Sequence, residues 1–154
     1  MIRTYIGVGS NLGDPIRRVR AGIAALRAVG EIVAVSSLYR TPAWGKTDQP
    51  DFVNAAVALN TSRSPRDLLR ALKSLERELG RVEGERWGPR VIDFDILIYG
   101  NERVDEADLT IPHARLRERA FALIPLAEIA PEYGEDLGGI SEGDRAAITK
   151  IAAR

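Results

Sequence analysis

A strand that alternates acidic and apolar residues stands out in the stretch from Glu85 to Gly100, ERWGPRVIDFDILIYG. Side chains two apart on a strand point to the same side, so Asp93 and Asp95 should share one face of a sheet. The apolar residues around them should face the other side and belong to the core: Ile92, Phe94, Ile96 and Ile98. The chain must therefore build a sheet with one buried face and one face that carries two neighbouring charges.

The pair Asp93 and Asp95 predicts a cation site. Two carboxylates held side by side repel each other unless a positive charge lies between them. Hard oxygen ligands suit Mg²⁺, which keeps several waters and usually also binds substrate phosphates. The alternative is structural, because an Asp at a strand end can be a solvated edge residue or the partner of an arginine.

Three arginines precede the acids and favour the site over the structural alternative: Arg81, Arg86 and Arg90. Gly84, Gly88 and Pro89 interrupt this segment, as expected for a mobile loop. Guanidinium groups that move over a phosphate chain complement a metal bound beneath it. We therefore expect a combined metal and phosphate site.

Composition limits the partners and the size of the protein. The chain has 154 residues, which we interpret as a single domain spanning residues 1–154 with a substantial core. Lys plus Arg and Asp plus Glu number 22 each, so zero net charge argues against nucleic acid and anionic membranes as partners. There is no cysteine, and the N-terminus has no apolar run typical of a signal peptide. We expect a cytoplasmic monomer with a local anion site.

Periodicity predicts the order strand, helix, strand, strand, helix, strand. The expected ranges are 2–8, 15–29, 31–39, 52–59 and 65–79, followed by the strand of Asp93 and Asp95. This order is typical of an α+β, ferredoxin-like αβα sandwich with an antiparallel βαββαβ sheet, to which the rest of the chain adds C-terminal elements. Enzymes and RNA-binding proteins both use this fold, so it does not decide the function.

Four other features have two interpretations. The spacing of Gly7, Gly9 and Gly13 does not match a dinucleotide fingerprint, and we interpret it as a turn. Phe52 and Asn54 share a strand face, where the ring either packs in the core or faces a site. The second helix carries a stripe of basic residues, which is usually solvated surface and alternatively a nucleic-acid contact: Arg66, Arg70, Lys73 and Arg77. His113 is either incidental or an anion contact, since Pro112 fixes its turn near several arginines.

Five segments between Tyr5 and Glu132 resemble the 6-hydroxymethyl-7,8-dihydropterin pyrophosphokinase family of folate biosynthesis. They are YIGVGSNLGD, SSLYRTPAWG, QPDFVNAAVAL, LGRVEGERWGPRVIDFDILIYG and LTIPHARLRERAFALIPLAEIAPE. The combination RWGPRxxDxD followed by a TxPH turn is the most specific part. The resemblance implies transfer of the terminal diphosphate of ATP to the hydroxymethyl group of a reduced pterin, with release of AMP.

The same resemblance implies roles for individual residues. Asp93 and Asp95 would hold two Mg²⁺ ions, and together with Arg81 and Arg90 they would form the catalytic set. Further ATP contacts would come from Arg86, Trp87, Ile96, Thr110, His113 and Arg119. Phe52 and Phe121 would sandwich the pterin ring. Its hydrogen-bonding edge would meet Asn54 and the backbone of Thr41, Pro42, Ala43, Trp44 and Gly45. Residues 40–51 and 81–90 would act as lids that exclude water.

Two other functions remain open at this point. An RNA-binding module would use the sheet face and the basic stripe, but it predicts a basic excess that the chain lacks. A metal-dependent phosphohydrolase would use the same acids with an activated water in place of a pterin pocket.

Overall fold

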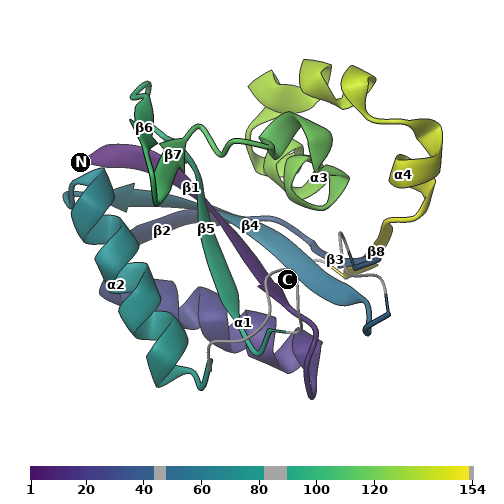
Figure 1. Cartoon of the computed structure of the whole chain (residues 1–154), viewed down its shortest axis with the longest axis horizontal. Coiled ribbons are helices and arrows are strands. Elements are labelled where there is room, and N and C mark those ends of the chain that lie inside the picture. The colour runs from purple at the N-terminus through teal and green to yellow at the C-terminus, as the bar shows by residue number, and fades with distance from the viewer. Residues whose placement is uncertain (44–47, 82–89, 153–154) are drawn as a thin grey trace.

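Helices cover both faces of an antiparallel sheet in the computed structural model (Figure 1). The structure describes residues 1–43, 48–81 and 90–152. Helices α1 (Pro15–Ala25) and α2 (Pro65–Glu78) lie on one face, and α3 (Ala120–Ile129) lies on the other. Two apolar clusters fill the two interfaces, one on each side of the sheet. The predicted αβα arrangement is confirmed.

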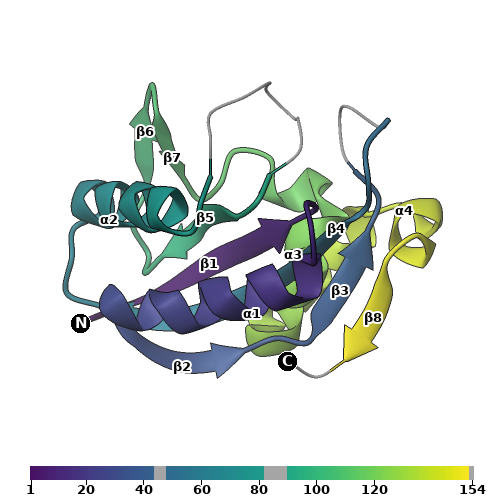
Figure 2. The same cartoon turned by 90° about the horizontal axis from the view of Figure 1, so that it is seen from below.

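The strand order matches the ferredoxin-like prediction. In the main sheet β5, β1, β4, β3 and β8 lie side by side in that order, and β2 pairs with the other half of β4 (Figure 2). All of these pairings are antiparallel. The strand bounds are β1 (Ile2–Ser10), β2 (Glu31–Val35), β3 (Leu38–Thr41), β4 (Phe52–Thr61), β5 (Asp93–Tyr99) and β8 (Thr149–Ala152).

The glycines near the N-terminus correct the predicted turn. Gly7 and Gly9 belong to β1 and pair with both neighbouring strands. Only Gly13 has the positive φ, 63°, that a turn of this kind requires of glycine. Asp14 then caps α1, because its side chain accepts a hydrogen bond from Arg17 N at 3.3 Å.

The predicted strand 31–39 is two strands, separated at Ser36 and Ser37. The Ser36 hydroxyl accepts a hydrogen bond from Ala56 N at 2.8 Å and donates one to Ser37 O at 2.7 Å. A side chain therefore takes a place in the ladder that a backbone carbonyl would otherwise fill. The ten-residue β4 pairs with β2 and β3 in succession.

A bulge in β5 overturns the predicted position of Ile98. Tyr5 faces Ile98 across the strands while Ile6 faces Ile96, so Leu97 is an extra residue in β5. Phe94 and Ile96 pack against the helices α1 and α2, as predicted. Ile98 lies in the cluster beneath α3 instead, because the bulge reverses the alternation after Ile96.

The helices occupy nearly the predicted ranges, with small differences in length. Helix α1 ends at Ala25, four residues before the predicted end at residue 29. The chain continues from there as a 3-10 turn, η1 (Leu26–Ala28). In α2 the apolar stripe of Leu68, Leu72 and Leu75 is buried, and Gly80 follows with φ 99°.

Several elements were not predicted from the sequence. Residues after Gly100 form a hairpin of β6 (Val104–Glu106) and β7 (Leu109–Ile111), then η2 (Leu116–Glu118). After α3 come η3 (Pro131–Gly139), α4 (Glu142–Ala146) and β8. The described ranges contain no helix long and apolar enough to cross a bilayer.

Candidate active site

A cavity of about 490 Å³ opens between the sheet and the segments around α3. Its size is in the usual range for small-molecule sites. Residues from six elements and the segments between them reach it: Gly7, Gly9, Thr41, Pro42, Phe52, Asn54, Ala55, Lys73, Arg81, Arg90, Asp93, Asp95, Leu97, His113, Arg119, Phe121 and Ala122. Most of the residues proposed from the sequence therefore meet in one place.

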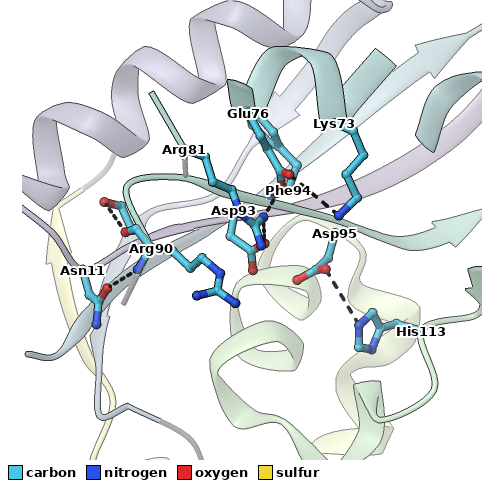
Figure 3. Close-up of polar contacts among 10 residues, drawn as sticks. Asn11, Lys73, Glu76, Arg81, Arg90, Asp93, Phe94, Asp95 and His113 are labelled. Carbon is cyan, nitrogen blue, oxygen red and sulfur yellow. Dashed lines mark hydrogen bonds and ion pairs between the residues drawn. The ribbon is translucent and has the colours of Figure 1, made fainter. Parts of the chain in front are cut away.

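The two acids lie on the floor of this cavity (Figure 3). Asp93 faces Gly9 and Asp95 faces Gly7 across the β1–β5 ladder. Gly7 and Gly9 both line the cavity, and because they have no side chains they leave room there for the Asn54 amide and the Leu97 side chain. Gly7 and Gly9 are therefore site residues that the sequence interpretation missed. Two glycines at i and i+2 within a strand were the available signal.

The environments of the two acids differ. Arg81 Nη1 lies 2.8 Å from Asp93 Oδ1, so Asp93 has a cationic partner. Burial in the cavity and the charge of Asp93 raise the pKa of Asp95 to about 8. Its side chain keeps 40% exposure, and the cavity is the space that it faces. A bound cation would lower the cost of holding both carboxylates ionised.

Glu76 is a buried acid that the sequence interpretation did not assign. Its side chain is buried, with the residue only 2% exposed. Its carboxylate accepts a hydrogen bond from Phe94 N at 2.8 Å and lies 2.9 Å from Arg81 Nη1 (Figure 3). Lys73 Nζ lies 3.8 Å away. Burial and the charge of Asp93 raise the pKa of Glu76, while the Phe94 N–H lowers it. Glu76 continues the helix stripe at a spacing of four from Leu72, which could have revealed it.

His113 is neutral near pH 7. Burial and the positive charge of Arg119 lower its pKa to about 4. Arg115 N donates to His113 Nδ1 at 3.5 Å, which leaves Nε2 as the protonated nitrogen, 4.0 Å from Asp95 Oδ1. A neutral imidazole in this position can donate one hydrogen bond to an anion.

Arg119 connects the charged end of the cavity to the aromatic end. It is 8% exposed at the start of α3, and its charge acts on Asp95. Its guanidinium carbon lies 5.6 Å from the centre of the Phe121 ring, within the range of a cation–π contact. One arginine thus lies next to both a carboxylate and an aromatic ring.

The aromatic end is formed by Phe52, Phe121 and Asn54. Phe52 is half-buried and lines the cavity, outside both apolar clusters, so the core interpretation is wrong. Asn54 Nδ2 donates to Thr41 Oγ1 at 2.8 Å, which fixes the amide. A Cβ at Gly9 would lie 2.4 Å from Asn54 Oδ1, so a glycine is required beside it.

Asn11 joins the described ends of the two segments proposed as lids. Its side-chain amide donates to Gln49 Oε1 at 2.8 Å and to Pro50 O at 3.0 Å. Its side-chain oxygen accepts a hydrogen bond from Arg90 N at 2.8 Å, and its backbone N donates one to Arg90 O at 3.0 Å (Figure 3). The residue is 3% exposed. One buried amide therefore fixes the backbone beside Arg90 relative to the segment before Phe52.

Some proposed site residues lie elsewhere. The Ile96 side chain is in the core, Thr110 is exposed on β7, and Ala43 is buried beside Pro42. None of these three lines the cavity. Trp44, Gly45, Arg86 and Trp87 lie outside the described residues.

The basic stripe of α2 does not form one surface. Arg66 pairs with Glu106 and Asp108 of the hairpin, and Lys73 lines the cavity. Arg70 contacts Asp67 at 3.5 Å on the exposed side of the helix. This distribution favours the solvated-surface interpretation over nucleic-acid contact.

The residues present fit a magnesium ion that is completed by a substrate. No group of three or more His, Cys, Asp or Glu that could enclose a metal occurs in residues 1–43, 48–81 and 90–152. Asp93 and Asp95 supply two hard oxygen donors in an open space. Mg²⁺ is commonly held by one or two carboxylates plus waters and phosphates, so the donor set is suitable.

The cavity of this ferredoxin-like fold has one end with carboxylates and cationic side chains and another end with aromatic rings. The model of the 7,8-dihydro-6-hydroxymethylpterin-pyrophosphokinase family matches residues 5–131. The chain belongs to this family. The predicted resemblance is thereby confirmed.

Similar proteins support the assignment. The 2-amino-4-hydroxy-6-hydroxymethyldihydropteridine pyrophosphokinase of Methylorubrum extorquens is 48% identical over 153 residues, covering 98% of this chain and 94% of that protein. The protein of the same name from Pseudomonas aeruginosa is 46% identical over 132 residues, covering 84% and 82%.

Solved structures agree on the fold. A Plasmodium falciparum HPPK-DHPS chain, crystallised with pterin and p-hydroxybenzoate, superposes with a TM-score of 0.70 at 14% identity. The match covers 97% of the present chain but only 47% of that longer one.

Proposed function

We propose that the cavity carries out the reaction of this family, which belongs to folate biosynthesis. The hydroxyl oxygen of 6-hydroxymethyl-7,8-dihydropterin attacks the β-phosphorus of ATP, the bond from that phosphorus to the α-phosphate oxygen breaks, and AMP leaves. The observation that carries this proposal is the presence of Asp95 and Phe121 in one cavity, with Arg119 between them. An anion site and a ring site are adjacent, as transfer between a nucleotide and a flat ring requires.

Asp93 and Asp95 would hold Mg²⁺, which we propose as two ions. Bound there, magnesium would neutralise phosphate charge and align the reacting groups. Phosphate contacts would come from Arg81, Arg90, His113 and Arg119. Because its pKa is lowered, His113 would stay neutral and donate one hydrogen bond to a phosphate oxygen.

The aromatic end would hold the pterin. Phe52 and Phe121 stack on its faces, and stacking of this kind contributes about 0.5–1.5 kcal/mol beyond the buried area. Asn54, fixed by Thr41, reads the polar edge of the ring together with backbone from residues 41–45. A few polar groups in an otherwise apolar slot are the usual means of orienting such a ligand.

The remaining assignments follow the family resemblance. Arg86 and Trp87 would contact ATP from the segment 81–90, and the adenine would lie by the backbone of Ile96, near Thr110. We place the enzyme in the cytoplasm, where ATP and Mg²⁺ are plentiful. We also propose that the enzyme is a monomer.

Phosphorus NMR tests the reaction. The protein is incubated with ATP and Mg²⁺, with and without 6-hydroxymethyl-7,8-dihydropterin. We expect AMP and a pterin diphosphate to form only when the pterin is present. ADP with free phosphate, formed regardless of the pterin, would identify a phosphohydrolase and contradict the proposal.

A further inference from the structure

Glu128, near the C-terminal end of α3, connects that helix to the sheet. Its Oε2 accepts hydrogen bonds from Ser37 N at 2.9 Å and from Ser37 Oγ at 3.1 Å. Its Oε1 accepts one from Tyr39 OH at 2.5 Å. Hydrogen bonds to an ionised carboxylate are shorter and stronger than those between neutral groups. Glu128 therefore connects α3 to Tyr39 of β3 and to Ser37, the residue just before that strand.

The same helix carries Phe121, one wall of the aromatic end of the cavity. We call this end, formed by Phe52, Asn54 and Phe121, the aromatic slot. Phe121 and Glu128 are seven residues apart, which is close to two turns, so they project from the same side of α3. Glu128 is exposed, but its hydrogen bonds to Ser37 and Tyr39 place this side at the β3 edge of the interface where α3 packs over β3 and β4 (Figure 1). The position of Phe121 over the slot thus depends on how α3 is seated two turns away.

The strand β3 carries the opposite wall. Tyr39 is the ladder partner of Asn54, and Thr41 is the ladder partner of Phe52. Thr41 also accepts the hydrogen bond that fixes the Asn54 amide. Ser37 and Tyr39, which Glu128 contacts, are therefore connected along β3, and through its pairing with β4, to Phe52 and Asn54 opposite Phe121.

We infer that Glu128 is a positioning residue that sets the separation of Phe121 from Phe52 and Asn54, and so selects for a flat bicyclic ring. The inference rests on the proposed function, which places the pterin in this slot. Glu128 touches neither substrate. It acts through Ser37 and Tyr39 on one side and through α3 on the other.

Glu128 remains a carboxylate at neutral pH, as this role requires. Burial alone would raise its pKa, but the hydrogen bonds from Tyr39 and Ser37, together with the charge of Lys150, outweigh that effect and lower it. Burial, together with the hydrogen bond to Glu128 and the charge of that carboxylate, raises the pKa of Tyr39, whose hydroxyl therefore stays protonated as a donor.

The test compares the binding of two ligands to several variants. Glu128→Ala removes all three hydrogen bonds, whereas Glu128→Gln keeps an oxygen for Ser37 N and an amide that can donate to the Tyr39 oxygen. Asp136→Ala is the matched control, because Asp136 pairs with Arg117 at 3.2 Å within the helical layer and does not connect it to β3. Calorimetry gives the Kd of the pterin and, separately, of an unreactive ATP analogue with Mg²⁺.

We expect Glu128→Ala to weaken pterin binding about tenfold, equivalent to about 1.4 kcal/mol, and to change ATP-analogue binding less than about twofold. Glu128→Gln should recover most of the pterin affinity, and Asp136→Ala should alter neither ligand. Equal losses for both ligands, or an unchanged pterin Kd in folded Glu128→Ala, would overturn the inference.

Two further outcomes are decisive. If Glu128→Ala does not fold, Tyr39→Phe removes only one hydroxyl and should still weaken pterin binding about threefold; an unchanged Kd overturns the inference. If the unaltered protein binds no pterin, the proposed function fails and the inference fails with it. If the unaltered protein binds the pterin and no variant changes that affinity, the inference about Glu128 is contradicted while the proposed function stands.

Discussion

Arg81 Nη1 and Asp93 Oδ1 are 2.8 Å apart on the cavity floor, while Asp95, two residues along the same strand, has a raised pKa. The two neighbouring acids are therefore not equivalent. Asp93 already has a guanidinium partner, whereas Asp95 gains most from a cation that arrives with the substrate. This asymmetry gives Asp95 the greater effect on metal and nucleotide binding.

Replacement of Asp95 should remove activity and leave the fold intact. Asp95→Ala deletes an oxygen donor that the proposed metal site requires, so we expect turnover to fall on the order of 10³-fold, as for loss of a major electrostatic group. A coupled assay for AMP measures the rate, and circular dichroism checks the fold. Asp105→Ala, at an exposed acid of the β6–β7 hairpin, is the control and should retain full activity. Near-normal turnover in Asp95→Ala would remove this carboxylate from the mechanism.

The pKa of Asp95 predicts how stability depends on pH without metal. Between its ordinary value of 3.8 and its folded value of about 8, the folded protein holds a proton that the unfolded chain has lost. Raising the pH across this window therefore favours unfolding. We expect the Tm of the metal-free protein to fall from pH 5 to pH 8 more steeply than that of Asp95→Asn, measured in EDTA. Parallel pH profiles for the two proteins would contradict the assigned shift.

Loss of the Phe52 ring should separate the two ligands. Phe52→Ala removes one stacking surface at the aromatic end and none of the proposed phosphate contacts. We expect the pterin Kd to rise about tenfold and the ATP-analogue Kd to change little. Calorimetry with each ligand alone measures both. Equal losses for the two ligands would indicate that the ring acts through packing.

Glu76 should contribute to stability as well as to the site. Glu76→Ala removes the buried acceptor of the Phe94 N–H and one of the carboxylates that Arg81 contacts, which should lower the free energy of unfolding by about 3 kcal/mol. Urea denaturation measures the change. Glu78→Ala, on the exposed side of the same helix, should cost less than about 0.5 kcal/mol. A similar small loss in both variants would show that Glu76 is not a structural link.

The sequence predicted those features that depend on local periodicity. The position of α2, the shared face of Asp93 and Asp95, and the shared face of Phe52 and Asn54 on β4 follow from side-chain spacing alone. The family resemblance then supplied the chemistry of the site.

Features that depend on contacts between distant segments were missed. The bulge at Leu97 reflects the register with β1, and Ser36 interrupts a strand through a bond to Ala56. Asn11 acquires its role from Gln49 and Arg90, which lie far from it in the sequence. No period within a single segment encodes these relationships.

The central claim is that one cavity brings a metal-bound triphosphate and a pterin together beside Asp93 and Asp95. Replacing Mg²⁺ by paramagnetic Mn²⁺ tests this directly, in a complex with the pterin and an ATP analogue whose α–β bridge cannot break. We predict that the hydroxymethyl protons of the pterin and the β- and γ-phosphorus signals all broaden. Asp95→Ala should abolish the broadening of the pterin protons, while the phosphorus signals stay broad because Mn²⁺ also binds the free triphosphate. Broadened phosphorus signals beside sharp pterin signals would place the two ligands in separate sites and contradict the account.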